Sequence, residues 1–384
     1  MAAPTQHGRG PADGAAERGQ GPQESPGPEP AFVYTDRDLF RSGIRWDGPR
    51  PRSRLDAALR SAWARRMEAG CFRYRLWGPE LPSRELPGPR RLLAQLNVRR
   101  ATERRRPQEI LSVRQPFDPQ RFNFGRVPRR ELLFTLRRSG REPGAPNGRE
   151  GEALLIINVS PLQYGHVLLL PEPERLLPQA LTRASLLWAL DLVFLSSDPA
   201  FRVGFNSLGA FASVNHLHLH GFYLQHRLEV EWAPTQPLGQ AGAGARVHQL
   251  RDHFTQGLVL FSDGSDGAGA ADTLLAVSDL LLRRSLAHNL LVTRGCQLGP
   301  RAPDADSRDG VRLILWPRTS CFGVKDESAF NVAVCELAGF LPVKTARDFE
   351  ILTEESALQI IDRYLLPPEH FSQISAEIAR LPLN

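Results

Sequence analysis

The sequence predicts an α+β fold, in which antiparallel strands form a sheet and helices pack against it. From about residue 117, short apolar runs separated by turn residues indicate strands, and one helix-length apolar segment is inserted among them. A doubly wound parallel sheet would instead alternate strands and helices regularly. With 384 residues, 41% of them hydrophobic, the chain can bury one large core or two medium ones.

The amino-terminal region divides into a polar segment and a helix. Residues 1–30 are rich in Gly, Pro, Gln and Glu and have almost no bulky apolar side chain. Such a segment cannot offset its ordering entropy, so we expect it to be disordered, with structure beginning near Phe32. Ser53 is a suitable N-cap for a helix whose apolar residues recur at helical spacing until Gly70.

Strands are predicted where apolar or β-branched runs lie between turn residues. In the first half of the chain these runs span 72–77, 92–98, 131–136, 153–159, 165–170, 203–206 and 212–224. The arginine-rich stretch 99–108 is predicted to be a solvated linker. The apolar stretch 181–195 predicts a buried helix, because it carries Asp191 and is too short to cross a bilayer.

The second half has a similar but fainter pattern. Two low-complexity stretches, 239–245 and 262–271, are predicted to be flexible loops, since neither has the glycine spacing of a phosphate-binding loop. The elements expected after them are a helix at 273–287, strands at 288–293, 312–317 and 331–337, and a helix at 353–365. We therefore expect a catalytic lobe with an amino-terminal extension at 31–235 and a second, degenerate lobe of the same kind at 236–384.

The basic charge favours a small anionic ligand over nucleic acid. The net charge is +6, and arginines are dense between Arg90 and Arg141, whereas Lys325 and Lys344 are the only lysines. No nucleic-acid module motif is present, and aromatic residues do not alternate with the arginines as a stacking surface requires. No apolar run predicts a membrane span, and the four widely spaced cysteines are typical of a reducing compartment, so we expect a cytoplasmic protein.

The most informative segment is the alternating run His216-Leu217-His218-Leu219-His220. On a strand, residues two apart share a face, so the three imidazoles would line one side and the two leucines would pack into the core behind them. Three histidines on one face of an apolar strand are costly without a shared task, although three core histidines satisfied by their neighbours remain an alternative.

Two chemical interpretations compete for this face. A metal site is disfavoured, because same-face Cα atoms two residues apart are about 6.6 Å apart and zinc–nitrogen bonds are only about 2.1 Å long. A site for a phosphoryl group fits better. His218 would attack phosphorus through a neutral ring nitrogen, while its other nitrogen is held by an acceptor, expected to be a backbone carbonyl. His216 and His220 would donate hydrogen bonds to the surrounding oxygens. No metal or other cofactor is expected.

These histidines and several flanking blocks resemble the GDP-sugar phosphorylase branch of the histidine triad superfamily. The blocks that carry the resemblance are Phe122–Phe124, Asn158–Pro171, Ser213–His220, His288–Arg294 and Phe330–Phe340. The resemblance covers roughly residues 110–370 and implies a histidine-triad-like antiparallel sheet. It also implies that inorganic phosphate cleaves a GDP-hexose, with GDP-D-glucose the expected substrate, through a GMP adduct on His218 and without a metal.

The resemblance extends to individual residues. It implies His218, His216 and His220 as catalytic residues, and the substrate-binding candidates are Asn158, Gly209, Ser213, Arg318 and Lys325. His166 is open between a structural and a functional role. The plant members of the branch carry glutamine at the position of His220, so hydrolysis of a GDP-sugar or nucleotide with release of GMP is the main alternative. A nucleotide-binding regulatory module and a homodimer also remain open.

Overall fold

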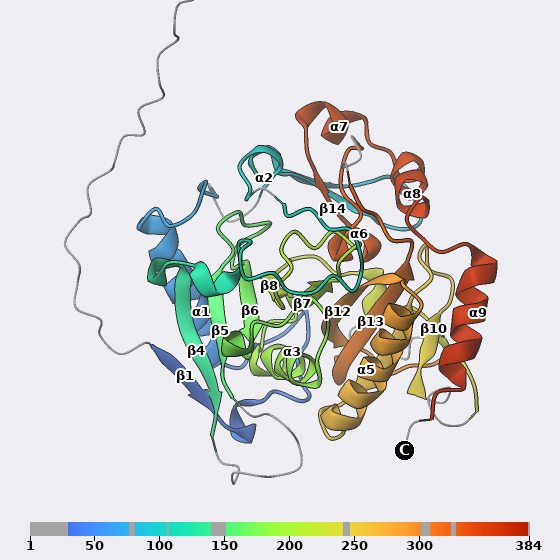
Figure 1. The fold of residues 1–384 in the computed structure, drawn as a ribbon, viewed down its shortest axis with the longest axis horizontal. Coiled ribbons are helices and arrows are strands. Elements are labelled where there is room, and N and C mark those ends of the chain that lie inside the picture. The colour runs from blue at the N-terminus through green and yellow to red at the C-terminus, as the bar shows by residue number, and fades with distance from the viewer. Residues whose placement is uncertain are drawn as a thin grey trace, which may run out of the picture.

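The computed structural model describes residues 30–76, 81–105, 107–139, 151–240, 246–300, 308–323 and 328–382. An eleven-stranded sheet runs through the molecule in the order β1-β4-β5-β6-β8-β7-β12-β13-β11-β10-β9 (Figure 1). Its strands are β1 (Ala31–Tyr34), β4 (Leu132–Arg138), β5 (Ala153–Ile157), β6 (Val167–Pro171), β7 (Phe201–Asn206), β8 (Leu219–Tyr223), β9 (Thr235–Pro237), β10 (His248–Leu250), β11 (Leu258–Ser262), β12 (Ala287–Gly295) and β13 (Gly310–Arg318). All neighbouring pairs are antiparallel except β1 and β4.

A small second sheet and the helices complete the described fold. The second sheet has the order β14-β3-β2, formed by β14 (Phe340–Val343), β3 (Leu93–Leu96) and β2 (Ser83–Glu85). The helices are α1 (Arg54–Glu68), α2 (Val98–Thr102), α3 (Arg183–Leu195), α5 (Gly267–Arg283), α6 (Val334–Leu337), α7 (Ala346–Ile351), α8 (Glu354–Asp362) and α9 (Pro368–Ala379). Short 3-10 turns are η1 (Asp36–Asp38), η2 (Phe124–Arg126), η3 (Arg129–Glu131), η4 (Pro173–Arg175) and η5 (Glu229–Glu231). Among the described helices, none is long and apolar enough to cross a membrane.

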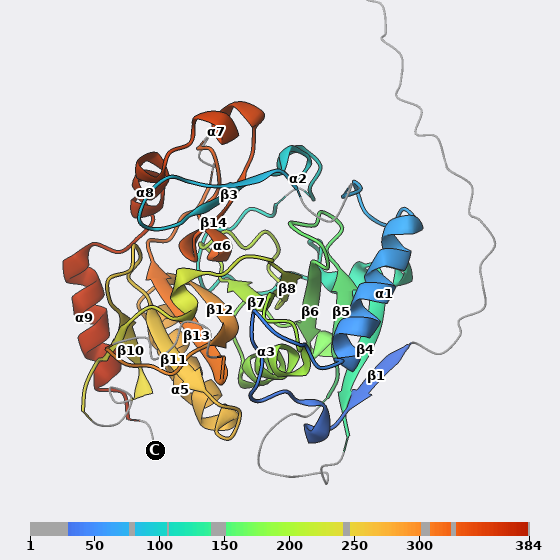
Figure 2. The ribbon, with the colours of Figure 1, turned by 180° about the vertical axis from the view of Figure 1, so that it is seen from behind.

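The two faces of the large sheet bury different clusters. Alternate strand residues, such as Leu290 and Val292, join side chains from α1, α3, α5 and α9 in one core. These helices are seen from opposite sides in Figures 1 and 2. On the other face, Leu291 packs under α6, α8 and the small sheet, whereas Ile156 packs near Phe124. This division follows from the two-residue period of strands that are buried on both faces.

The middle of the large sheet repeats one connection. In the first half β6 leads through α3 to β7 and β8, and the spatial order is β6-β8-β7. In the second half β11 leads through α5 to β12 and β13, and the spatial order is β11-β13-β12. The two units meet where β7 pairs with β12. This shared order supports the prediction of two related lobes, but the lobe boundaries at 235 and 236 stay a prediction.

The predicted α+β class is confirmed, and so are most strongly patterned elements. Ser53 caps α1 by accepting a hydrogen bond from the Asp56 N–H, and the predicted helix at 181–195 is α3. The predicted strands that the structure contains, with ends shifted by a few residues, are those at 92–98, 131–136, 153–159, 165–170, 203–206, 288–293 and 312–317.

Other predictions were wrong. The described part of 72–77 forms bends, and 331–337 contains α6, which Glu336 caps by accepting the Ala333 N–H. The predicted linker 99–108 begins inside α2, whose cap is Asn97. The predicted loop 262–271 ends early because Asp266 caps α5, so glycines and alanines form its first turn. Residues 1–29, Trp77 and 241–245, on which further predictions fall, lie outside the described residues.

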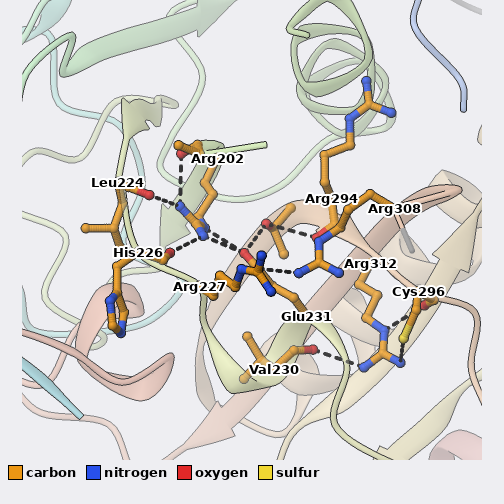
Figure 3. Close-up of polar contacts among 12 residues, drawn as sticks. Arg202, Leu224, His226, Arg227, Val230, Glu231, Arg294, Cys296, Arg308 and Arg312 are labelled. Atoms are coloured by element: carbon orange, nitrogen blue, oxygen red, sulfur yellow. Dashed lines mark hydrogen bonds and ion pairs between the residues drawn. The ribbon is translucent and has the colours of Figure 1, made fainter. Parts of the chain in front are cut away.

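A buried ionic network lies where the two units meet (Figure 3). Arg202 of β7 donates to Glu231 at 2.6 Å, and Arg308 lies 3.3 Å from the other oxygen of the same carboxylate. Arg312 of β13 donates to the carbonyls of Val230 and Cys296. All three guanidinium groups and the carboxylate are almost fully buried. Glu231 therefore compensates the buried positive charge of Arg202 on β7 and of Arg308, which lies just before β13.

Removing this carboxylate should be strongly destabilising. We expect Glu231→Ala to lower the free energy of unfolding by about 3–5 kcal/mol, because it leaves buried guanidinium groups uncompensated. Urea denaturation followed by circular dichroism measures the change. The control is Glu85→Ala, which removes an ion pair between exposed side chains and should cost less than about 1 kcal/mol. Equal losses in the two variants would contradict this account.

Candidate active site

The histidine run is not one continuous strand, which corrects the predicted strand 212–224. β8 begins at Leu219, so His216 and His218 lie in the irregular segment that leads into it, and His220 alone of the three lies on the strand. The predicted burial of the leucines is confirmed, because Leu217 and Leu219 both belong to the helix-covered core. The alternation of side chains is thus retained, although the backbone is not paired in a ladder.

A glutamine side chain takes the place of the missing neighbouring strand. The His218 N–H donates to Gln179 Oε1 at 2.9 Å, and Gln179 Nε2 donates to the His218 carbonyl at 3.1 Å and the Asn206 carbonyl at 2.9 Å. The Gln179 N–H in turn donates to Asn215 Oδ1 at 2.9 Å. Because the backbone N–H and carbonyl of His218 are both hydrogen-bonded, burying this residue does not carry the free-energy cost of unpaired backbone groups.

The hydrogen bond made by Nδ1 fixes the reactive nitrogen of His218. His218 Nδ1 lies 2.7 Å from the His216 carbonyl oxygen. A carbonyl only accepts, so Nδ1 carries the proton and Nε2 of the neutral ring carries the lone pair. Burial lowers the pKa of His218 to about 4, so the ring is neutral at pH 7. The predicted backbone acceptor is therefore confirmed.

His216 has the opposite tautomer. Its Nδ1 accepts the Phe124 N–H at 3.0 Å, so the proton of the neutral ring is on Nε2. The ring lies between Phe124 and Phe117, and burial lowers its pKa to about 4. His216 is not among the residues that line the pocket described below. Its visible contribution to that pocket is the carbonyl that orients His218.

A hydrogen bond from His166 determines the tautomer of His220. His166 Nδ1 accepts the Leu162 N–H at 2.8 Å, so His166 Nε2 carries the proton and donates it to His220 Nδ1 at 3.0 Å. His220 Nε2 is then the protonated nitrogen. Burial lowers the pKa of both rings well below the usual range, so both are neutral. Asn158 Nδ2 lies 3.2 Å from the same protonated nitrogen of His166, which makes a contact between two donors and leaves the Asn158 amide available to a ligand.

These groups face a pocket of about 290 Å³ above the sheet. One part of its lining is apolar and is formed by Phe124, Ile156, Leu168 and Val214. The opposite part is formed by residues 331–344 that include Asn331, Ala333, Glu336, Pro342 and Lys344. The rest of the lining is mostly polar and includes Arg100, Arg104, Arg105, Glu131, Asn158, Asn206, Ser213, His218 and His220.

The pocket carries an excess of positive charge. Its lining includes four cationic side chains, Arg100, Arg104, Arg105 and Lys344, but only two carboxyl groups. Burial raises the pKa of one of these, Glu336, to about 7, so it is partly neutral near physiological pH. A concave site with this balance attracts an anion such as a diphosphate.

The predicted site residues have different positions relative to this pocket. His218, His220, Asn158 and Ser213 line it. Outside the lining, Gly209 has a φ of +74° and its Cβ position faces the Phe322 ring at 3.0 Å. Arg318 is fully buried, donates to the Val332 carbonyl and lies against the Tyr364 ring. Lys325 lies outside the described residues. The roles assigned to these residues stay predictions.

Several pocket residues were not found from the sequence. Glu131, and Gln179 beside the pocket, carry no motif that marks them, and Glu336 lies in the Phe330–Phe340 block without having been assigned a role. Arg100, Arg104 and Arg105 fall in the stretch predicted to be a linker, although the density of arginine there was the signal for an anionic ligand. His166 was left open between two roles, and its contact with His220 gives it a positioning role.

The comparisons with known proteins agree with this geometry. The model of the GDPGP1-like N-terminal domain matches residues 54–222, and that of the GDPGP1-like C-terminal domain matches residues 229–382. The chain belongs to the GDPGP1-like family. It is 48% identical over 351 residues to GDP-D-glucose phosphorylase 1 of Danio rerio, covering 91% of this chain and 98% of the relative. The human protein of that name is 48% identical over 364 residues, covering 92% of each chain.

More distant GDPGP1-like relatives and solved structures extend the likeness. GDP-L-galactose phosphorylase 2 of Arabidopsis thaliana is 30% identical, covering 90% of this chain and 80% of the relative. Yeast Ap4A phosphorylase Apa2 in complex with AMP has a similar fold, with a TM-score of 0.55 at 16% identity over 82% of this chain and 97% of that one. The family resemblance seen in the sequence is thus confirmed.

The tautomers assigned here can be observed directly. In nitrogen-15 NMR spectra of the histidine rings at pH 7, we expect His218 to be protonated on Nδ1 and His220 on Nε2. His166→Phe removes the donor to His220 and should leave His220 in a mixture of tautomers, while His218 is unaffected because its partner is a backbone carbonyl. An unchanged His220 spectrum in this variant would contradict the proposed positioning role of His166.

The buried neutral histidines should make the fold sensitive to acid. The pKa values of His218 and His288 are lowered to about 4, below about 6.5 in the unfolded chain. Their contribution to stability is therefore complete above pH 6.5 and is lost as pH falls towards 4. Each should reduce the free energy of unfolding by about 1.4 kcal/mol per pH unit in this window. Urea denaturation at several pH values between 7.5 and 5 measures how the free energy of unfolding depends on pH. The slope below pH 6.5 should be smaller in His288→Gln by about 1.4 kcal/mol per pH unit, the contribution of one histidine.

Proposed function

We propose that this chain catalyses the phosphorolysis of GDP-D-glucose, in which inorganic phosphate converts a GDP-hexose to GDP and hexose 1-phosphate. The names of the relatives that are 48% identical support the substrate. The observation that carries the chemistry is the bond from His218 Nδ1 to the His216 carbonyl, which leaves a lone pair on Nε2 beside a basic pocket. A neutral imidazole held in this way is suited to attack phosphorus.

In the first step, His218 Nε2 attacks the α-phosphorus. The bond from this phosphorus to the bridging oxygen breaks, and the β-phosphate leaves as hexose 1-phosphate with that oxygen. GMP remains bound to Nε2 through a phosphorus–nitrogen bond. In the second step, an oxygen of inorganic phosphate attacks the same phosphorus, the phosphorus–nitrogen bond breaks, and GDP is released.

The neighbouring side chains stabilise the charge that develops on the phosphate oxygens. His220 Nε2–H and the Asn158 amide are neutral donors whose orientation is set before the substrate binds. The cationic residues Arg100, Arg104 and Lys344 would compensate the diphosphate and the incoming phosphate. No step in this scheme requires a metal ion.

Two further parts of the proposal concern location and water. A cytoplasmic location is supported by four cysteines that are all free thiols.

Water could take the place of phosphate in the second step and release GMP instead of GDP. This hydrolytic alternative, left open in the sequence by His220, is distinguished from phosphorolysis by its products.

The covalent intermediate has a direct test. Protein mixed with GDP-glucose in the absence of phosphate should gain the mass of one GMP, and mild acid should remove it because the phosphorus–nitrogen bond is acid-labile. His218→Asn should form no adduct and lose at least about 10⁴-fold in kcat, whereas His220→Ala should lose about 10²–10³-fold, the usual effect of removing one such donor. A fully active His218→Asn variant would exclude the mechanism.

The products decide between phosphorolysis and hydrolysis. With phosphate present we expect GDP and glucose 1-phosphate in equal amounts, and without phosphate we expect turnover to stop at one equivalent of hexose 1-phosphate. Sustained release of GMP without phosphate would instead establish the hydrolase.

A further inference from the structure

We propose that Glu131 selects guanine, with its carboxylate accepting the N1–H and the 2-amino group of the base and Arg105 donating to O6. This inference rests on the proposed function, because it assigns the base of the GDP-hexose to the apolar end of the pocket. Three observations support it: a row of residues of suitable length, a pocket-lining carboxylate to which no described residue donates a hydrogen bond, and a guanidinium group beside that carboxylate.

The sheet provides a row from His220 to Leu132, the residue that follows Glu131. Leu132 pairs with Ile156, Ile156 with Leu168, and Leu168 with His220, so these four residues lie side by side across β4, β5, β6 and β8. Three strand spacings of about 4.8 Å separate the ends of the row by about 14 Å. This is roughly the length of a nucleoside monophosphate with a hydrogen bond at each end.

The middle of this row is apolar and suits a planar base. Ile156 and Leu168 form one cluster with Phe124 and Val214, and all four side chains line the pocket. The Phe124 ring centroid lies 4.8 Å from that of His218, so the apolar part begins directly beside the proposed nucleophile. A purine can pack there while its phosphate remains at His218.

Glu131 lies at the far end of the row, where its carboxylate is accessible from the pocket. It is the last residue of η3, directly before Leu132, and its side chain lines the pocket although the residue is only 8% exposed. Among the described residues its nearest charged partner is Arg105, whose Nη2 lies 3.6 Å from Oε2, which is too long for a hydrogen bond. A buried carboxylate in this position favours a ligand that brings N–H groups.

Guanine presents the groups that this pair can satisfy. Its Watson–Crick edge has two adjacent donors, N1–H and the 2-amino group, followed by the acceptor O6. The carboxylate fits the donors and the guanidinium group fits O6. Hypoxanthine lacks the 2-amino group and leaves one carboxylate oxygen unpaired. Adenine turns the bare N1 towards the carboxylate, which is repulsive.

The test compares kcat/KM for GDP-glucose, IDP-glucose and ADP-glucose in the wild-type protein and in Glu131→Gln. The wild-type protein should prefer GDP-glucose over IDP-glucose by about 10- to 100-fold, the effect of one hydrogen bond to a charged acceptor. In Glu131→Gln this ratio should fall to about threefold or less. ADP-glucose should gain at least about tenfold relative to GDP-glucose, because the amide nitrogen of Gln can donate to adenine N1, whereas the carboxylate of the wild-type protein repels it.

Each ratio compares kcat/KM for two substrates on the same protein preparation. If part of a variant is unfolded, both kcat/KM values fall by the same factor and the ratio does not change. The matched control is Glu336→Gln, the same chemical change in the opposite wall of the pocket. It should lower kcat/KM for GDP-glucose and IDP-glucose alike and keep their ratio within about twofold. A GDP-to-IDP ratio unchanged in Glu131→Gln, or reduced equally in Glu336→Gln, would overturn the assignment.

Equilibrium binding separates this inference from the proposed function. Dissociation constants of GMP, IMP and AMP, measured by calorimetry, should show the same order and the same response to Glu131→Gln without any turnover. If the wild-type protein failed to cleave GDP-glucose with phosphate, the proposed function would be wrong, while the GMP-to-IMP binding ratio would still decide the role of Glu131.

Discussion

The site depends on one hydrogen bond, from His218 Nδ1 to the carbonyl of His216. Burial keeps the imidazole neutral but does not decide which nitrogen carries the proton. The carbonyl decides this, and it does so without a titratable partner, so the orientation of the lone pair is the same at every pH at which the ring is neutral. A carboxylate in the same place would raise the histidine pKa and add negative charge beside an anionic substrate.

This bond explains why the segment is not a regular strand. In a continuous ladder the His216 carbonyl would be paired with a neighbouring strand, and that donor would compete with the ring two residues later. The irregular backbone releases this carbonyl, and Gln179 satisfies the N–H and carbonyl of His218 in place of a strand. Alternation in the sequence correctly predicted that Leu217 and Leu219 are buried, but it could not reveal a partner 39 residues away.

Local patterns predicted what local forces determine. α1 and α3 follow from apolar periodicity and their caps, and the acceptor for His218 follows from the chemistry of a neutral nucleophile. The failures involve side-chain caps and tertiary contacts that the apolar pattern does not show. The stretch 331–337 is apolar enough for a strand, yet α6 forms there because Glu336 caps its first turn and Asn206 accepts the Val334 N–H at 3.0 Å. The arginines beyond residue 99 were predicted to be solvated because only the fold brings them to the pocket.

The two units of the sheet contribute differently to one pocket. The first unit supplies His220 and, together with the neighbouring strands β4 and β5, the apolar row, while α6 and β14, which follow the second unit, supply the opposite wall. Gly204, which pairs with His220, permits this approach: a Cβ there would lie 2.9 Å from Val334 Cγ1. Any side chain at position 204 would therefore push α6, and with it Glu336, away from the histidines. The buried charges of Arg202, Glu231 and Arg312 connect the two halves where they meet, so the position of this wall also depends on that ionic network.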